Sequence, residues 1–231
     1  DVQQLNKWAF EGKLDITKLS FHAFTYCVED YVLLDSGSVL GRNCGPLLIK
    51  KPDIILTPES KIAIPGKYTT ANMLLNIASP EYTNKIEILF SEIENEILTK
   101  EVDAGLIIHE NRFTFQDKGL EKVKDLGEFW EEETRLPIPL AGIAVNRNIS
   151  VRIQQKIERI LRKSVEYAFG NRESSSEFVK IHAQEAEREV VDAHINLYVN
   201  DFSIALGEEG KGAIERIFQN LGKPTDNIFI R

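Results

Sequence analysis

Three short apolar stretches, separated by helical patterns, limit what this chain can fold into. They lie at 61–64, 86–90 and 104–108, and the third is almost wholly apolar, as is typical of a central strand in a parallel sheet. Ser91 and Glu94 form a capping-box pattern at the start of the second intervening helix. Strands that alternate with helices form βαβ units, so the sequence predicts an α/β fold.

The chain on either side of this unit has a different pattern. Short strand candidates precede it at 14–16, 31–34 and 47–49. One strand at 142–145 follows it, and then helices only, at about 150–170, 174–186, 187–201 and 208–221. We therefore expect one lobe, residues 58–141, to be inserted between the two pieces of another, residues 1–57 and 142–231.

Charge and cysteine content exclude several classes of partner. The net charge is -8 at pH 7, so no basic field attracts nucleic acid or an anionic membrane. No apolar run approaches the roughly 20 residues of a membrane-spanning helix. Cys27 and Cys44 have neither metal-site spacing nor the pattern of a disulfide framework. We expect two reduced thiols and no bound metal in a cytoplasmic protein.

His109 is the first candidate for chemistry, because it follows the apolar strand at 104–108 directly. Ligands of open α/β sheets gather outside the carboxyl ends of the strands. A histidine of ordinary pKa is largely neutral at pH 7 and can act as a general base. A strand-end histidine that only donates a structural hydrogen bond explains the position equally well. For Glu110 and Arg112, substrate binding competes with surface solvation or an ion pair between lobes.

Two further segments lie where a strand gives way to a helix. At Thr69-Thr70-Ala71, the free N–H groups of a helix start suit a carboxylate, and threonine adds a hydroxyl. Lys18-Leu19-Ser20 offers an amine and a hydroxyl to another polar part of a ligand. A plain helix cap is the alternative for both segments. We interpret the remaining histidines as packed or half-exposed helix residues: His22, His182 and His194.

Many segments of this chain, in order, resemble the 1,4-dihydroxy-6-naphthoate synthase family of the futalosine route to menaquinone. The segment that runs from Val102 to Glu110 through His109 and the Leu-Pro-Ile-Pro-Leu segment at 136–140 are the most specific of them. The other matching segments are 15–20, 36–38, 41–42, 45–46, 65–66, 69–71, 112–113, 130–134, 182–185 and 198–200.

This resemblance implies a fold like that of the type II periplasmic-binding proteins, with two lobes around a cleft. It implies that cyclic dehypoxanthinylfutalosine, a small carboxylate, is split to 1,4-dihydroxy-6-naphthoate and dihydroxyacetone without metal or organic cofactor. His109 matches the general base of the family. Lys18, Leu19 and Ser20, with Thr69, Thr70 and Ala71, match its substrate-contacting segments.

Family members carry an earlier strand and loop that this sequence lacks, so we expect the N-terminal strand of the first lobe to be missing. Asp1 begins a helical pattern at once, which agrees with that expectation. Two alternatives remain at this stage: a sister lyase like chorismate dehydratase, and a solute-binding module that closes on a ligand without turnover. Appearance of the naphthoate product would distinguish the synthase from both alternatives. The oligomeric state does not follow from the sequence.

Overall fold

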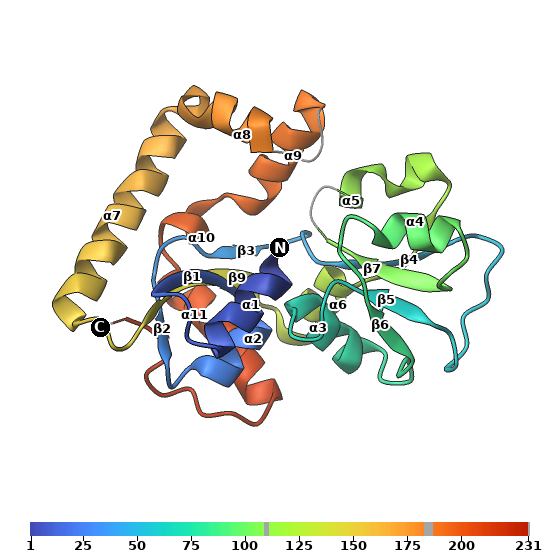
Figure 1. Ribbon diagram of the computed structural model, residues 1–231, viewed down its shortest axis with the longest axis horizontal. Helices are drawn as coiled ribbons and strands as arrows, with labels where there is room; N and C mark the ends of the chain where they lie inside the picture. The colour runs from blue at the N-terminus through green and yellow to red at the C-terminus, as the bar shows by residue number, and fades with distance from the viewer. Residues whose placement is uncertain (109–110, 183–186, 231) are drawn as a thin grey trace.

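The computed structural model describes residues 1–108, 111–182 and 187–230, and it contains two separate sheets, on the left and right of Figure 1. In the first sheet, every strand pairs antiparallel with one long central strand. Its strands are β1 (Ile16–Ser20), β2 (Tyr31–Leu33), β3 (Val39–Gly41) and the central β9 (Ile138–Asn146). The second sheet has the order β6 (Lys85–Glu87), β5 (Ile62–Ile64), β7 (Ala104–Ile107), β4 (Leu47–Lys50), β8 (Glu121–Asp125).

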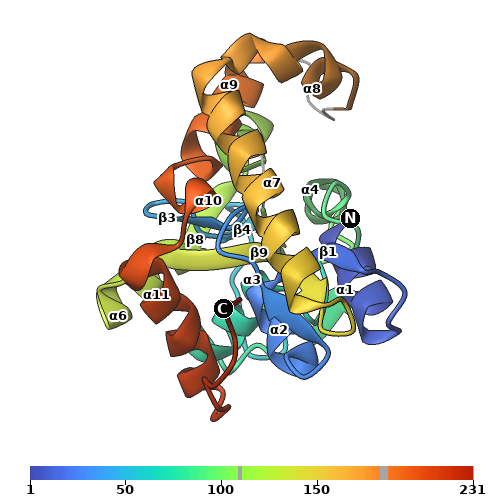
Figure 2. The same ribbon diagram turned by 90° about the vertical axis from the view of Figure 1, so that its left-hand side faces the viewer.

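Helices pack against both sheets, and α7, α8 and α9 form an arch that extends away from the first one (Figures 1 and 2). The α-helices of the described residues are α1 (Val2–Phe10), α2 (Phe21–Cys27), α3 (Thr70–Ala78), α4 (Ile93–Leu98), α5 (Asn111–Thr114), α6 (Leu126–Thr134), α7 (Val151–Gly170), α8 (Ser176–His182), α9 (Arg188–Tyr198), α10 (Asp201–Ile204) and α11 (Gly207–Asn220). Short 3-10 turns lie at Phe115–Lys118 and Arg172–Ser175.

The predicted βαβ units are confirmed. β5 pairs parallel with β6 on one side and with β7 on the other, while α3 and α4 connect the strands. All residues of β5 and β7 are buried, as their apolar sequences predict. The carboxyl ends of β5 and β7 therefore lie at the same edge of the second sheet.

Strand pairing departs from the expected division of the chain at β4 and at the first residues of β9. β4 lies within the predicted first piece, 1–57, yet it pairs antiparallel with β7 and β8 in the second sheet. The apolar sequence of β4 is compatible with either sheet, so only its pairing partners determine the sheet to which it belongs. β9 also starts earlier than the predicted 142, at Ile138. Pro139 is tolerated there because this part of β9 pairs with β3 but not with β1. The missing N–H of proline therefore interrupts no hydrogen bonds to a second neighbouring strand.

Two local predictions were wrong. The strand predicted at 14–16 lies at Ile16–Ser20, where it pairs with β9 along its whole length. The Ser91–Glu94 capping box does not form, because α4 starts at Ile93 and has no side-chain cap. The carboxylate of Glu94 is buried and accepts hydrogen bonds from Asn111 and Lys118 instead.

One hydrophobic cluster extends through both sheets. It contains Leu19 and Tyr31 from the first sheet, Ile62 and Leu106 from the second, and Trp130 from α6. Each of these five side chains is essentially inaccessible to solvent. The two sheets are therefore joined by shared apolar packing as well as by the chain itself.

Cys27 and Cys44 are both buried and free, which confirms the predicted reduced thiols. Burial raises the pKa of each thiol to about 12. The thiolate is the reactive form of cysteine, so both side chains behave as small apolar core residues at neutral pH.

The chain crosses between the sheets twice, and the two crossings touch at a pair of glycines. Gly45 lies between β3 and β4, and Gly127 lies in the first turn of α6, after β8. A Cβ atom on Gly45 would lie 2.1 Å from the backbone nitrogen of Gly127. Leu126 N–H also donates to the Pro46 carbonyl at 2.9 Å. Only residues without side chains allow the two backbones to approach this closely.

Gly45→Ala and Gly127→Ala should therefore each lower the free energy of unfolding by about 1–3 kcal/mol or more, the usual cost of overpacking. Urea unfolding would measure the loss. Gly212→Ala is the control: a Cβ there meets nothing within 4 Å, and the residue lies inside α11. That change should stabilise the protein by about 0.5–1 kcal/mol, the difference between alanine and glycine in a helix. Unaltered stability of Gly45→Ala would contradict the contact.

Candidate active site at the helix starts

Ser20 joins the two sheets through its side chain. It ends β1 and precedes α2, but its hydroxyl makes no cap hydrogen bond with that helix. The hydroxyl donates to the Tyr68 carbonyl, at 2.9 Å, and accepts from Asn6 Nδ2, at 2.8 Å. The cap interpretation of the Ser20 side chain is therefore wrong, and Ser20 instead holds the start of α2 against the segment that follows β5.

The other two residues of the same segment differ in exposure. Leu19 is 1% exposed and belongs to the core, so only its backbone can reach a ligand. Lys18 points to the other face of β1, where its side chain is exposed. The surrounding protein still desolvates the amine enough to lower the pKa of Lys18. Of the three predicted residues, Lys18 and Ser20 thus present polar side chains, both on the face of the strand opposite to Leu19.

Thr69 is an ordinary N-cap of α3. Its hydroxyl accepts from Asn72 N–H, at 3.2 Å, and donates to the Gly66 carbonyl, at 2.7 Å. The cap alternative is therefore confirmed for this threonine. The Thr69 hydroxyl already has a donor and an acceptor. Its role is therefore to hold the start of α3 in place.

Thr70 and Ala71 form the first turn of α3, and both are buried. The Thr70 hydroxyl donates to the Leu140 carbonyl of β9, at 2.8 Å, and accepts from His22 N–H, at 3.4 Å. In the described part of the chain, the N–H groups of Thr70 and Ala71 find no acceptor. These two donors are the groups that a carboxylate would use at a helix start.

The structure therefore brings the two predicted segments together. Ser20 touches Tyr68, and His22 touches both Thr69 and Thr70. The starts of α2 and α3, which come from different sheets, are thus direct neighbours.

His109 and Glu110 lie outside the described residues. What the structure gives is the course of the chain on either side of them. β7 ends at Ile107, at the sheet edge where β5 also ends and from which α3 starts. The chain resumes at Asn111, the first residue of α5.

The described residues after β7 are held by charged groups. The Arg112 guanidinium forms an ion pair with Asp125 at 2.9 Å, and both side chains are largely buried. Arg112 thus forms an ion pair within the predicted lobe 58–141, so neither surface solvation nor the predicted ion pair between lobes describes it. On the other side, Asn111 and Lys118 both donate to the buried carboxylate of Glu94.

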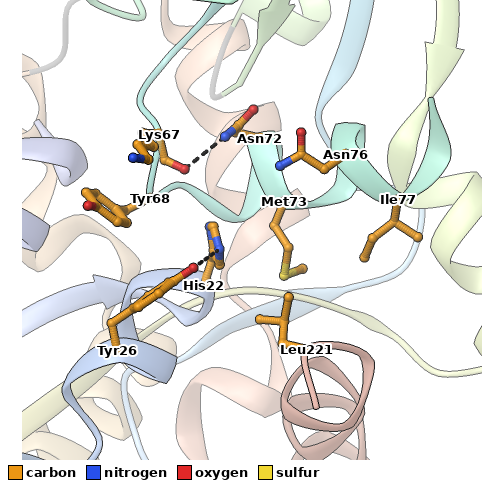
Figure 3. A pocket seen from close by; sticks show the side chains of 9 residues that line it. All are labelled: His22, Tyr26, Lys67, Tyr68, Asn72, Met73, Asn76, Ile77 and Leu221. Atoms are coloured by element: carbon orange, nitrogen blue, oxygen red, sulfur yellow. Dashed lines mark hydrogen bonds between the residues drawn. The ribbon is translucent and has the colours of Figure 1, made fainter. Parts of the chain in front are cut away.

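A cavity of about 280 Å³ lies beside the helix starts, between α2 and α3 (Figure 3). Its lining residues are His22, Tyr26, Lys67, Tyr68, Asn72, Met73, Asn76, Ile77 and Leu221. We predicted His22 as a packed helix residue, and its 6% exposure confirms that. The sequence reasoning missed its contact with the cavity. The signal for it was the spacing of His22 and Tyr26, which puts both on one face of the helix that follows Ser20.

The His22 ring is held at both nitrogens. Nδ1 lies 3.2 Å from the Thr69 carbonyl, so it carries the proton and donates, while Nε2 lies 3.4 Å from the Tyr26 hydroxyl. Burial, and to a smaller degree the charge of Lys223, lower the pKa of His22, although the bond to Thr69 opposes them. His22 is therefore a neutral imidazole that links α2 to the start of α3.

Comparisons with known proteins identify the family of this chain. A family model described as menaquinone biosynthesis matches residues 1–223. The chain is 41% identical over 218 residues to the 1,4-dihydroxy-6-naphthoate synthase of Thermus thermophilus, which covers 94% of this chain and 80% of that protein. The synthase of Streptomyces coelicolor is 38% identical over 219 residues, 93% of this chain and 78% of that protein. The chain belongs to this synthase family.

Solved structures show the fold of the family. A crystal structure of an Archaeoglobus fulgidus protein has a TM-score of 0.90 and 34% sequence identity, over 96% of this chain and 84% of that one. The periplasmic aliphatic sulphonate binding protein of Escherichia coli has a TM-score of 0.61 and 16% identity, over 99% and 78% of the two chains. The predicted α/β fold, like that of the periplasmic-binding proteins, is confirmed. Among the described helices, none has the length and apolarity to cross a membrane.

The lowered pKa of His22 should make the protein more sensitive to acid. Above the ordinary histidine pKa of about 6.5, the residue is neutral in the folded and unfolded states alike. As the pH falls through that value, the unfolded state binds a proton that the folded state resists, so the free energy of unfolding decreases. His22→Asn cannot titrate and keeps a donor for Thr69. It should lose less stability than the parent between pH 7.5 and pH 5.5.

Urea unfolding at the two pH values would measure this difference. His182→Asn, the same substitution at an exposed helix position, is the matched control. Equal acid sensitivity of His22→Asn and the parent would show that His22 does not contribute.

Proposed function

We propose that this protein splits cyclic dehypoxanthinylfutalosine to 1,4-dihydroxy-6-naphthoate and dihydroxyacetone in the cytoplasm, in menaquinone biosynthesis. The observation that carries the proposal is the 41% identity to the Thermus thermophilus synthase over 94% of this chain. The contact between the starts of α2 and α3 supports it, because residues from both predicted substrate segments meet there. The reaction needs no metal and no organic cofactor.

His109 is the general base in this proposal. It follows Ile108 at the edge of the second sheet from which α3 also starts. A neutral imidazole there takes a C–H proton from the bound substrate. The electron pair of that C–H bond forms a double bond, while an adjacent bond of the skeleton breaks and its electron pair leaves with the departing fragment. The reaction requires a neutral imidazole and a site from which water is excluded.

The carboxylate of the substrate binds at the start of α3. The N–H groups of Thr70 and Ala71 are its donors, assisted by the partial positive charge of the helix start. The Thr70 hydroxyl joins them when it exchanges the Leu140 carbonyl for the carboxylate. Lys18, Leu19 and Ser20 contact another polar part of the ligand, the second through its backbone, while Thr69 keeps α3 in place. A protein of net charge -8 must hold an anion by such local donors.

Turnover of the cyclic substrate by the full chain, with release of the naphthoate, would test this function. His109→Ala and His109→Asn should fold normally and lose roughly 2 to 4 orders of magnitude in rate, the usual contribution of general base catalysis. Circular dichroism would confirm the fold. Near-parental rates in both variants would exclude His109 as the base. Binding of the substrate without any product would favour a solute-binding module, and conversion of chorismate instead would favour the sister lyase.

Two substitutions of Thr70 separate its hydroxyl from its N–H group. Thr70→Val removes the hydroxyl alone, whereas Thr70→Pro removes both and is tolerated, because proline suits the first residue of a helix and Thr69 is extended. Thr70→Pro should bind 1,4-dihydroxy-6-naphthoate more weakly than Thr70→Val by about 1.5–3 kcal/mol, the value of a hydrogen bond to a charged group. Calorimetry measures both dissociation constants. Equal constants would place the carboxylate elsewhere.

A further inference from the structure

Arg112 connects the segment after β7 to both crossings between the sheets. Its Nη1 donates to the Gly45 carbonyl at 2.6 Å, on the crossing from β3 to β4. Its Nη2 donates to Asp125 Oδ2 at 2.9 Å, where β8 leads into α6 and the second crossing. One guanidinium thus holds three parts of the chain that are distant in sequence.

Asp125 is itself fixed in place. Its Oδ1 accepts from Gly127 N–H, at 2.9 Å, and Glu128 N–H, at 3.2 Å, so the same carboxylate caps α6. Its backbone pairs with Leu47 across β4 and β8. An arginine attached to this carboxylate is therefore attached to the rigid junction of the two crossings.

The chemistry of the contact requires arginine. The guanidinium is a planar fork that directs donors at two acceptors at once, here a carbonyl and a carboxylate. A lysine amine on a flexible stem satisfies one of them at a time. The side chains of Arg112 and Asp125 are 16% and 8% exposed, so water does not replace a lost bond easily.

A second anchor holds the same segment from the opposite side. Asn111 Nδ2 and Lys118 Nζ both donate to Oε2 of Glu94, which is 3% exposed in the first turn of α4. Neighbouring residues, Asn111 and Arg112, are thus bonded to different elements: Asn111 to α4, and Arg112 to the two crossings. If the Arg112 contact is lost, the Glu94 contact remains, so the segment shifts instead of unfolding.

We propose that Arg112 is a positioning residue for the lyase reaction: it sets the place of the segment that carries the proposed base, His109, relative to the two crossings. This inference rests on the proposed function. Arg112 lies three positions after His109, and its guanidinium donates to Gly45 and Asp125. It therefore acts on His109 through the backbone that connects them, and not on the substrate. A displacement of about 1 Å at a reacting group can cost about 100-fold in rate.

The test compares Arg112→Lys, Arg112→Ala and Asp125→Asn with the parent chain in steady-state turnover of the cyclic substrate. In both Arg112 variants kcat should fall about 10- to 100-fold, as expected for a misplaced base, while KM stays within about twofold. Asp125→Asn keeps the cap of α6 but loses the charge, so its loss should be smaller. In the variants, kcat should be lower by the same factor at every pH, and the pH profile should not shift, because the base itself is unchanged.

Two controls separate this role from a general loss of stability. Arg42→Ala removes an exposed arginine of the first crossing, which pairs with Glu131 and Glu209, and should leave kcat unchanged. Ethylguanidinium in solution should restore part of the rate of Arg112→Ala and should leave the rate of Arg42→Ala unchanged.

A parent chain that turns over while both Arg112 variants keep its kcat would overturn this proposal alone. A rise in KM without a fall in kcat would overturn it as well, because Arg112 would then be a substrate contact. A parent chain without turnover would refute the proposed function, and this positioning role with it.

Discussion

The close approach of the two crossings is the constraint on which the rest of the structure depends. Gly45 and Gly127 meet backbone to backbone, and the Leu126 amide donates to the Pro46 carbonyl beside them. This contact fixes where each strand enters the second sheet and where α6 leaves it. The contact between the starts of α2 and α3 is a second link between the two sheets. Arg112 and Asp125 are held in place because they are hydrogen-bonded to each other and to the crossings.

The candidate site is built mainly from backbone groups. Ser20, Thr69 and Thr70 use their hydroxyls to hold protein carbonyls, which leaves the peptide N–H groups of Thr70 and Ala71 as the donors for an anion. Such donors cannot ionise and need no counterion, so they suit a protein of net negative charge. The side chains of Ser20 and Thr69 hold the helix starts in place. The segments that follow β5 and β7 lie close to each other because both strands end at the same edge of the sheet.

Periodicity and capping signals predicted part of this arrangement. The strands β5 and β7 and the Thr69 cap follow from local apolar pattern and turn residues, and these predictions are confirmed. The pairing of β4 with β7 and β8 could not be predicted, because an apolar run such as Leu47–Ile49 fits any buried strand and only its partner decides the sheet. The burial of Glu94 under Asn111 and Lys118 was equally hidden, since it arises from residues far along the chain. Local patterns found the segments of the site; their tertiary contacts assigned each hydroxyl its partner.

The burial of both cysteines has a practical consequence for measuring movement between the sheets. Burial raises the pKa of both thiols far above 7, so Cys27 and Cys44 stay protonated at neutral pH and react very slowly with maleimide dyes. Cysteines introduced at exposed positions would label selectively without removal of the native ones. Ile55, between β4 and β5, and Val151, at the start of α7, are 88% and 57% exposed. A donor and an acceptor dye at these two positions would report the separation of the sheets in solution, with and without ligand.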